Sequence, residues 1–367
     1  MPIFMDLHIV PGVSAKDVAE AHVKDLNIQT EFGCNCMTYW IDESRGSVFC
    51  LIEAPTAEAV SELHKKSHGL VPHNVVEVSK ETVDNFLGRL IDPKPEYLTE
   101  GGLKVFSDSA FRILVSVHHK DNVLMSHKLS KGYTSMLMNM LVDTISSFAA
   151  KNNGTIVQYP APYNLISFKS IIDALNFSKE LCNQLTEEQK NVLGFKLGIN
   201  AGEPLDEDGN LFSKTIKFFD DISFLDLKER VVVTPIVKKM NQDKILLCYD
   251  EKLKTLTSEQ CDIITKLNDI LEISYTDSDF KIPQWAKQMT TSTSGLFRMV
   301  NNLTDDSPIS LLKNFRLKKS LEILKTNTKS ISEIAFSCGF SSPAYFTKCF
   351  TEAYNISPSD YKNILLN

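Results

Sequence analysis

Residues 330–350 are Ser330-Ile-Ser-Glu-Ile-Ala-Phe-Ser-Cys-Gly339-Phe-Ser-Ser-Pro-Ala-Tyr-Phe-Thr-Lys-Cys-Phe350, a pattern that predicts a helix, a tight turn and a second helix. Ser330 and Glu333 have the spacing of a capping box, which starts a helix by pairing its first free N–H groups. Gly339 ends that helix, because glycine adopts the left-handed backbone conformation at no steric cost. Ser342 and Pro343 are favoured types for the N-cap and the first residue of a new helix.

The second helix has two faces. Four residues recur at the spacing of a buried stripe: Tyr345, Phe346, Cys349 and Phe350. Four others are left on the free face: Ala344, Thr347, Lys348 and Thr351. In a helix-turn-helix, the second helix lies in the DNA major groove with its N-terminal residues near the base edges. The alternative is an ordinary helical hairpin within an all-α domain.

This stretch resembles the DNA-binding domain of AraC-type transcription regulators. The resemblance continues through Asn355-Ile-Ser-Pro-Ser-Asp-Tyr361, and Phe315-Arg-Leu-Lys-Lys-Ser-Leu-Glu-Ile-Leu324 resembles the long connecting helix of that family. It implies an all-α double helix-turn-helix domain over residues 257–367 and double-stranded DNA as partner.

The first helix-turn-helix follows a capping box at Thr257 and Gln260. Residues 290–308 resemble the first recognition unit of the AraC family at Leu296, Arg298 and Ser307-Pro308, whereas Asp305 stands where that family usually has glycine. Gly295, inside the predicted recognition helix, lowers helix stability by about 1 kcal/mol.

Two recognition helices on one connecting helix are expected to enter successive major-groove segments about one helical turn apart. Arg298 is the candidate for a bidentate guanine contact, whereas Lys348 is a candidate for a base or a phosphate. The expected DNA contacts are Ser292, Thr293, Ser294, Phe297 and Arg298 on the first helix, and Ser342, Ala344, Tyr345, Thr347 and Lys348 on the second.

The chain of 367 residues is long enough for two or three domains. No apolar run approaches the ~20 residues of a membrane helix, and the N-terminus lacks the pattern of a signal peptide, so a cytoplasmic protein without membrane contact is expected. The net charge of −7 means that DNA binding must depend on a local basic surface. Candidates for that surface are Lys313, Arg316, Lys318, Lys319, Lys325 and Lys329.

Residues 1–82 predict a small ferredoxin-like domain of β-α-β-β-α-β order. The expected elements are a strand at Ile3–Ile9, a helix at Ala15–Ile28, a hairpin of Met37–Asp42 and Ser47–Glu53, a helix from Thr56 to His68-Gly69, and a strand at Val75–Val78.

Histidines are concentrated in this segment. His64 and His68 are four residues apart on one predicted helix, so both rings lie on the same face. His22 lies on the other helix, His8 ends the first strand and Cys50 lies on a central strand. Imidazole and thiolate together suit nickel, copper, zinc or iron. The alternative is a pair of solvated surface histidines.

The segment also resembles a family of small nickel-binding ferredoxin-like domains. The matching residues are Met5-Asp-Leu-His8, Ala21-His-Val-Lys-Asp-Leu26, Tyr39-Trp40, Phe49-Cys50, Glu53-Ala-Pro55 and His64 to Gly69. The resemblance implies a transition-metal site and a homodimer. The candidate ligands are His8, His22, Cys50, His64 and His68, for nickel first, with copper or zinc as alternatives.

Residues 83–109 have the Pro and Gly content of a linker. Residues 110–250 predict an α+β sandwich, and Leu197-Gly-Ile-Asn-Ala-Gly-Glu-Pro204 with Phe212 resembles the class III nucleotide cyclase domain. Such cyclases need two aspartates for the metal ions that bind triphosphate. The expected positions hold Ser116, Val117 and His118 on the first strand, and Pro160-Ala-Pro162 at the hairpin tip.

The cyclase family also uses an asparagine and an arginine on the helix after the loop, where this chain has Lys217 and Asp221. An acidic residue where the transition state needs a cation has the wrong sign. The expectation is a multidomain α+β transcription regulator, not an enzyme, controlled by metal at residues 1–82, with a degenerate cyclase-like domain for ligand sensing or dimerisation. The alternatives are a nucleotide or small-molecule sensor in the middle domain, or an active cyclase fused to a DNA-binding domain.

Overall fold

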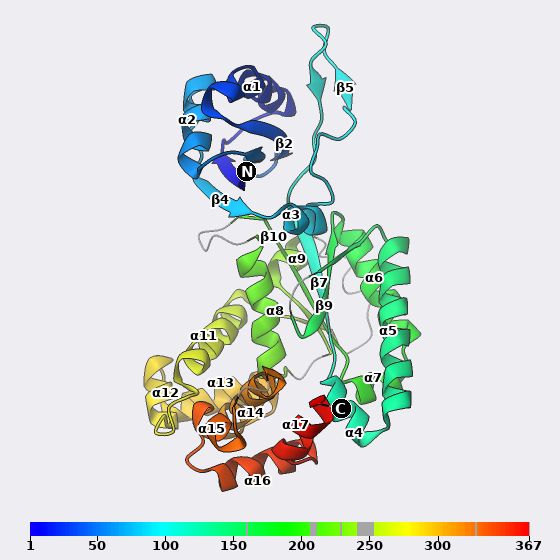
Figure 1. Ribbon diagram of the computed structural model, residues 1–367, viewed down its shortest axis with the longest axis vertical. Coiled ribbons are helices and arrows are strands. Elements are labelled where there is room, and N and C mark those ends of the chain that lie inside the picture. The colour runs from blue at the N-terminus through cyan, green and yellow to red at the C-terminus, as the bar shows by residue number, and fades with distance from the viewer. Residues whose placement is uncertain (159–160, 206–210, 228–229, 241–252, 327–328, 367) are drawn as a thin grey trace.

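The structure of the protein, a computed structural model, describes residues 1–158, 161–205, 211–227, 230–240, 253–326 and 329–366. The expected hairpin tip at residue 160, residues 206–210 of the expected loop and residues 241–250 at the end of the expected middle domain lie outside the described residues. The N-terminal sheet domain, the central sheet and the C-terminal helices follow one another along the long axis of the molecule (Figure 1).

The N-terminal domain has the predicted β-α-β-β-α-β order. Its elements are β1 (Ile3–Ile9), α1 (Ala15–Ile28), the 3-10 turn η1 (Gln29–Phe32), β2 (Asn35–Asp42), β3 (Ser47–Glu53), α2 (Ala57–Ser67) and β4 (Asn74–Val78). The sheet has the antiparallel order β2-β3-β1-β4. Ser14 and Thr56 cap the two helices, as their positions in the sequence predict.

The two faces of this sheet have different neighbours. Phe4 and Cys50 face the layer formed by α1 and α2. Met5 and Leu51 face the opposite way, toward α3 (Lys80–Leu87) and the central domain. The alternation along each strand therefore places a helix layer on one face and an interdomain core on the other.

Residues 83–109 contain structure where a linker was predicted: α3 begins before this segment, and the hairpin of β5 (Tyr97–Leu98) and β6 (Lys104–Val105) lies within it. Arg112 fixes the end of α3. Its buried guanidinium donates to the carbonyl oxygens of Phe86, Leu87, Ser109 and Phe111 at 2.6–3.1 Å. These bonds satisfy the last free carbonyls of the helix and join it to the first strand of the central domain.

The central domain is built on a six-stranded sheet with two helical layers. Its elements are β7 (Arg112–His118), α4 (Asn122–Lys128), α5 (Lys131–Lys151), β8 (Thr155–Val157), β9 (Tyr163–Phe168), α6 (Ile171–Gln184), α7 (Glu187–Leu193), β10 (Lys196–Gly202), α8 (Ser213–Leu225), β11 (Val231–Val233), α9 (Pro235–Met240) and β12 (Leu253–Thr255).

The strand order is β12-β11-β10-β7-β9-β8. The four strands β10-β7-β9-β8 repeat the connectivity of the N-terminal sheet, and two parallel strands extend it. Val115 and Val117 face α5 and α6, whereas Leu114 faces the α8 side.

The C-terminal domain is all-helical, as predicted. It contains α11 (Ser258–Ser274), α12 (Ile282–Gln288), α13 (Thr293–Thr304), α14 (Pro308–Thr326), α15 (Ile331–Ser337), α16 (Pro343–Tyr354) and α17 (Pro358–Leu366). Both predicted capping boxes are present, at Thr257 and Ser330. The prediction of a buried Tyr345 is wrong: it is 49% exposed, because the buried stripe of α16 is completed by Phe346, Cys349 and Phe350.

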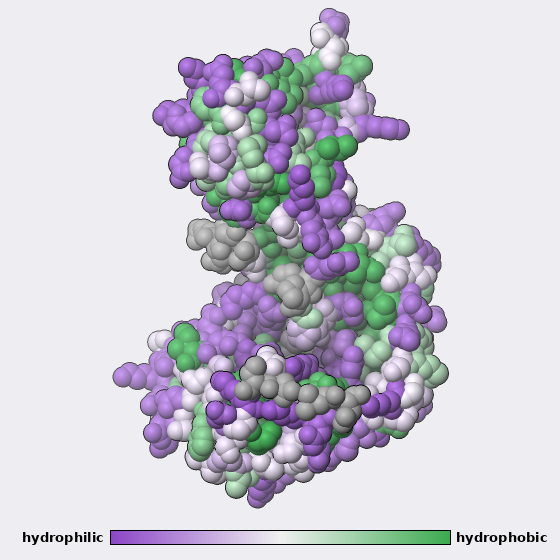
Figure 2. All heavy atoms as spheres, in the orientation of Figure 1, coloured by the Kyte–Doolittle hydropathy of each residue, from purple (hydrophilic) through white to green (hydrophobic). Residues whose placement is uncertain are grey.

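Helix α8 lies between α3 and the C-terminal helices (Figure 1). Its buried apolar residues belong to one core with residues of the N-terminal and C-terminal domains. At its start, the ring of Phe212 stacks on Phe86 of α3 with 5.0 Å between centroids. Near its end, Phe224 packs on Phe315 of α14, again at 5.0 Å. Figure 2 shows the N-terminal domain as a separate lobe above a larger body. Among the described helices, none is long and apolar enough to cross a bilayer.

Candidate metal centre and nucleic-acid interface

Four donor side chains meet between the N-terminal sheet and α2. Asp6 and His8 are two residues apart on β1 and so share a face, and Cys50 lies opposite Asp6 on β3. Helix α2 brings His64 over this face. All four residues are buried, and their ligand atoms lie within 4.8 Å of one another. We call Asp6, His8, Cys50 and His64 the strand group.

A second set shares His64. Asp25 of α1 and His68, at the C-cap of α2, join it in a group whose ligand atoms also lie within 4.8 Å of one another. The His64 Nδ1 atom lies 3.0 Å from His68 Nε2 and 3.3 Å from an Asp25 carboxylate oxygen. We call Asp25, His64 and His68 the helix group.

Two carboxylates control the protonation of His64. Its Nε2 atom lies 2.8 Å from Asp6, and Asp25 lies on the opposite side of the ring. Burial lowers the pKa of His64, but the two carboxylates outweigh it and raise that pKa to about 10. Burial likewise opposes ionisation of Asp6, yet His64 holds the pKa of Asp6 well below its usual range. Without metal, the ring is therefore an imidazolium between two carboxylates.

His8 and Cys50 differ from His64 in their hydrogen bonding and charge. The His8 Nε2 atom is buried without a hydrogen-bond partner, and the nearest carboxylate oxygen of Asp6 is 3.4 Å away. Burial and the nearby Asp6 raise the pKa of the Cys50 thiol, so it is neutral without metal. An unpaired buried imidazole nitrogen beside a thiol and a carboxylate fits a transition metal, because these are ligand types that such ions bind.

His22 lies outside both groups. Its ring packs on Tyr39 with 5.2 Å between centroids, and its Nε2 atom lies 3.9 Å from Asp92. Of the five predicted ligands, the structure brings together His8, Cys50, His64 and His68. Sequence reasoning missed Asp6 and Asp25. The signal for Asp6 was available, because an acidic residue two positions before His8 in an apolar strand must share its face.

The predicted DNA contacts of the first recognition helix lie on the surface of α13. Ser292, Thr293, Ser294, Phe297 and Arg298 are all exposed. Ser292 is also the N-cap, and its hydroxyl accepts from the Gly295 N–H at 3.1 Å. Asp305 ends the helix with φ = +63°, the left-handed conformation for which glycine is the unstrained residue.

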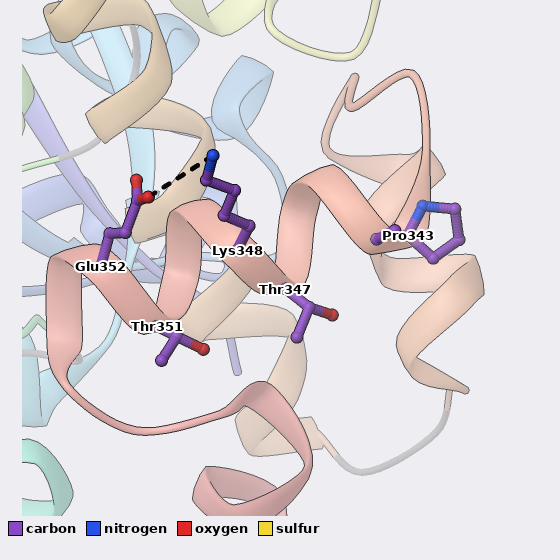
Figure 3. A pocket seen from close by; sticks show the side chains of 6 residues that line it. Pro343, Thr347, Lys348, Thr351 and Glu352 are labelled. Carbon is purple, nitrogen blue, oxygen red and sulfur yellow. Dashed lines mark ion pairs between the residues drawn. The ribbon is translucent and has the colours of Figure 1, made fainter.

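The predicted DNA contacts of the second recognition helix lie on the outward face of α16 and at its N-cap. Ala344, Tyr345 and Lys348 are exposed, and Thr347 is half-buried. A shallow open depression follows this face and is lined by Pro343, Ala344, Thr347, Lys348, Thr351 and Glu352 (Figure 3). Lys348 lies 3.9 Å from Glu352 one turn later. Ser342 caps the helix by accepting from the Tyr345 N–H at 3.2 Å.

The prediction of a basic DNA-binding surface is wrong for four of its six residues, because backbone carbonyl oxygens or carboxylates hold their cations. Lys318 and Arg316 donate to backbone carbonyl oxygens. Lys319 pairs with Glu272 at 2.7 Å, and Lys325 pairs with Asp121 at 2.8 Å. Lys318 and Lys325 therefore join α14 to the central domain, whereas the bonds of Arg316 and the Lys319–Glu272 pair lie within the C-terminal domain.

Two segments of the chain match known families. Residues 4–78 match the family described as nickel responsive protein SCO4226-like, and residues 285–364 match a helix-turn-helix domain family. The structure of SCO4226 from Streptomyces coelicolor A3(2) is similar, at 31% identity over 21% of this chain and 94% of that one, with a TM-score of 0.20.

Curated relatives match over shorter shares of their length. "Histidine kinase P4" of Formosa agariphila is 31% identical over 109 residues, which are 30% of this chain and 8% of that protein. "HTH-type transcriptional activator RhaR" of Pectobacterium carotovorum is 32% identical over 88 residues, 24% of this chain and 31% of that one. The chain thus spans less than a third of either relative. Residues 285–364 are an AraC-type helix-turn-helix domain, and residues 4–78 are an SCO4226-like domain.

Proposed function

We propose that the protein is a sequence-specific, DNA-binding transcription regulator controlled by a transition metal ion in its N-terminal domain. The observation that carries this proposal is the buried strand group, with its unpaired His8 nitrogen, in one chain with two helix-turn-helix units. Nickel is the first candidate, after the name of the family that residues 4–78 match. The binding of copper or zinc as alternatives to nickel, and the formation of a homodimer, stay predictions.

Asp6, His8, Cys50 and His64 would hold the ion, which would supply positive charge between buried carboxylates. In its absence the imidazolium of His64 supplies that charge and ties α2 to β1. A ligand shifts a conformational equilibrium only by its different affinity for the two states. When an ion replaces a ring proton of His64, the distance between β1 and α2 that best fits the bound group changes. This change in distance is what controls DNA binding in this proposal.

A continuous set of contacts supports coupling to the DNA-binding units. The sheet that carries Asp6 packs by its other face on α3. The end of α3 is fixed by Arg112 and stacks on Phe212 of α8. The far end of α8 holds α14, which joins both helix-turn-helix units, through Phe224 and Lys318. A shift of β1 against α2 would reach the recognition helices through α3, α8 and α14.

The central domain acts in this proposal as a connector without cyclase activity. Ser116, at the position expected for a metal-binding aspartate, lies 2.8 Å from His118. Burial lowers the pKa of His118 to about 3, so that ring is neutral. Asp221 is buried against Asn268 of α11 at 2.6 Å. Formation of cyclic nucleotide from ATP or GTP with magnesium or manganese would contradict this assignment.

The test is DNA affinity with and without metal. DNA selected in vitro by the metal-free protein and by the nickel-loaded protein is labelled, and binding to the full chain is followed by fluorescence anisotropy. We expect at least a fivefold change in Kd on loading, because allosteric coupling is typically worth about 1–3 kcal/mol. The His8→Ala chain should lose the change, whereas the control His73→Gln, at an exposed histidine outside both groups, should keep it. Equal affinity of loaded and metal-free wild-type chains would refute metal control.

A further inference from the structure

The ring of His64 faces a different set of ligands with each nitrogen. Nε2 points to Asp6 of the strand group at 2.8 Å. Nδ1 points to Asp25 and His68 of the helix group, at 3.3 and 3.0 Å. The lone pairs of the two ring nitrogens diverge, so one ion cannot use both. Each group therefore offers its own place for an ion, and His64 belongs to both.

Each group is compact enough to ligate an ion. Ligands at about 2.0–2.3 Å from one ion lie within roughly 4.6 Å of one another. Within each group the donor atoms lie within 4.8 Å of one another, so small side-chain shifts bring all of them into reach of one ion. The strand group offers a carboxylate, a thiol and two imidazole nitrogens. The helix group offers a carboxylate and two imidazole nitrogens.

We infer that the N-terminal domain holds two divalent transition-metal ions joined through the imidazole ring of His64. The other ligands are Asp6, His8 and Cys50 for the first ion, and Asp25 and His68 for the second. This inference rests on the proposed function only in placing metal in this domain.

The charges support this number of ions. His64 must give up both ring protons to bridge, and Cys50 must give up its thiol proton. The ligands then carry four negative charges, one each on Asp6, Asp25, Cys50 and the His64 ring, and two divalent ions bring four positive charges. A neutral total suits a buried site, since an unbalanced charge away from water is costly. In the metal-free chain, each N–H of His64 lies toward a carboxylate, where an ion would take its place.

Cobalt(II) is the probe, because it binds the same ligand types and remains high-spin with four to six such ligands. The full chain is stripped of metal, loaded with cobalt(II), dialysed and analysed for ions per chain by mass spectrometry. The wild-type chain should hold two ions. Cys50→Ser, which alters only the strand group, and His68→Gln, which alters only the helix group, should each hold one. The control His73→Gln should hold two, and circular dichroism checks that each variant is folded.

Magnetic susceptibility at low temperature tests the bridge. A shared imidazolate couples the spins of two ions, so the moment per ion of the wild-type chain should fall on cooling below that of the single-ion variants. One ion per wild-type chain would overturn the inference, and so would two ions with uncoupled moments. If the chain holds one ion and its DNA affinity depends on metal, the proposed function stands and this inference fails. If the chain holds two coupled ions that do not change its DNA affinity, this inference stands and the proposed function fails.

Discussion

The ammonium group of Lys318 in α14 lies 2.9 Å from the backbone carbonyl oxygen of Phe224 in α8, and 2.9 Å from that of Ser223. These carbonyls are in the last turn of α8, where no intrahelical N–H remains to bind them, and where the helix dipole favours a cation. Lys318 thus caps a helix of the central domain from within the DNA-binding domain.

Replacement of Lys318 by Met should weaken this docking. Two partly buried carbonyl groups lose their donor, which costs roughly 1–3 kcal/mol. Hydrogen exchange of the α8 amides and the urea midpoint of the full chain measure the loss. Lys313→Met on the same helix is the control and should change neither. Unchanged exchange in Lys318→Met would show that the apolar contacts alone hold α8 and α14 together.

Gly339→Ala should strongly destabilise the second helix-turn-helix. Gly339 has φ = +72°, and a Cβ atom there would lie 2.0 Å from the carbonyl oxygen of Tyr275. Left-handed strain alone costs about 1–2 kcal/mol, and the backbone clash adds to it, so we expect a loss of roughly 3 kcal/mol or more. Thermal and urea unfolding measure it.

Gly132→Ala is the matched control. Gly132 lies in the first turn of α5 with open space around its added Cβ, so alanine should be neutral or stabilise by up to about 1 kcal/mol. A similar loss in both variants would mean that the turn at Gly339 has no special requirement.

Asp221→Asn should stabilise the protein most at neutral pH. Burial raises the pKa of Asp221 from 3.8 to about 6, despite Lys217. The unfolded chain therefore loses this proton at lower pH than the folded chain, and native stability falls as pH rises between about 4 and 6, then stays constant. At pH 7.5 the charged group costs on the order of 3 kcal/mol.

Urea unfolding at pH 5 and pH 7.5 tests this sign. The gain from Asp221→Asn should be smaller at pH 5 by about 1 kcal/mol. Asp269→Asn, at an exposed partner of the same Lys217, should change stability little at either pH. A gain independent of pH would assign the effect to packing instead of charge.

Arg298→Ala should remove discrimination at one base position. Loss of a bidentate guanine contact costs roughly 1–3 kcal/mol against the preferred base only. Affinities for the selected DNA and for each single-base variant measure this. An equal loss on every sequence would identify Arg298 as a phosphate contact.

Lys348→Ala and Glu352→Gln should act in opposite directions. Removal of a phosphate-binding lysine lowers the slope of log affinity against log salt by about 1. Glu352 shares the outward face of α16 with Lys348 and repels the DNA backbone, so Glu352→Gln should strengthen binding, most at low salt. Titrations between about 50 and 200 mM salt measure both effects. Weaker binding by Glu352→Gln would indicate that Glu352 accepts a hydrogen bond from a base.

The local elements followed from the sequence because their causes are local. Capping at Ser330 and Thr257, and the chain reversal at Gly339, depend on residues within one or two turns, and the structure confirms each of them. The homodimer and the identity of the metal stay predictions, because they depend on partners outside the chain.

Tertiary packing decided what each charged or polar side chain does. The lysines of α14 had the composition of a DNA-binding surface. Because α8 packs against α14, however, the Lys318 ammonium donates to two backbone carbonyl oxygens of α8. Asp6 and Asp25 become neighbours of His64 only when strand β1 and the two helices pack together, since they are 58 and 39 residues away from it along the chain.

The sequence by itself determined the two helix-turn-helix units and the histidine-rich domain, because caps, turns and periodicity are local. Only the tertiary structure decided which ligands surround His64 and how that domain reaches the recognition helices, because such contacts depend on long-range packing.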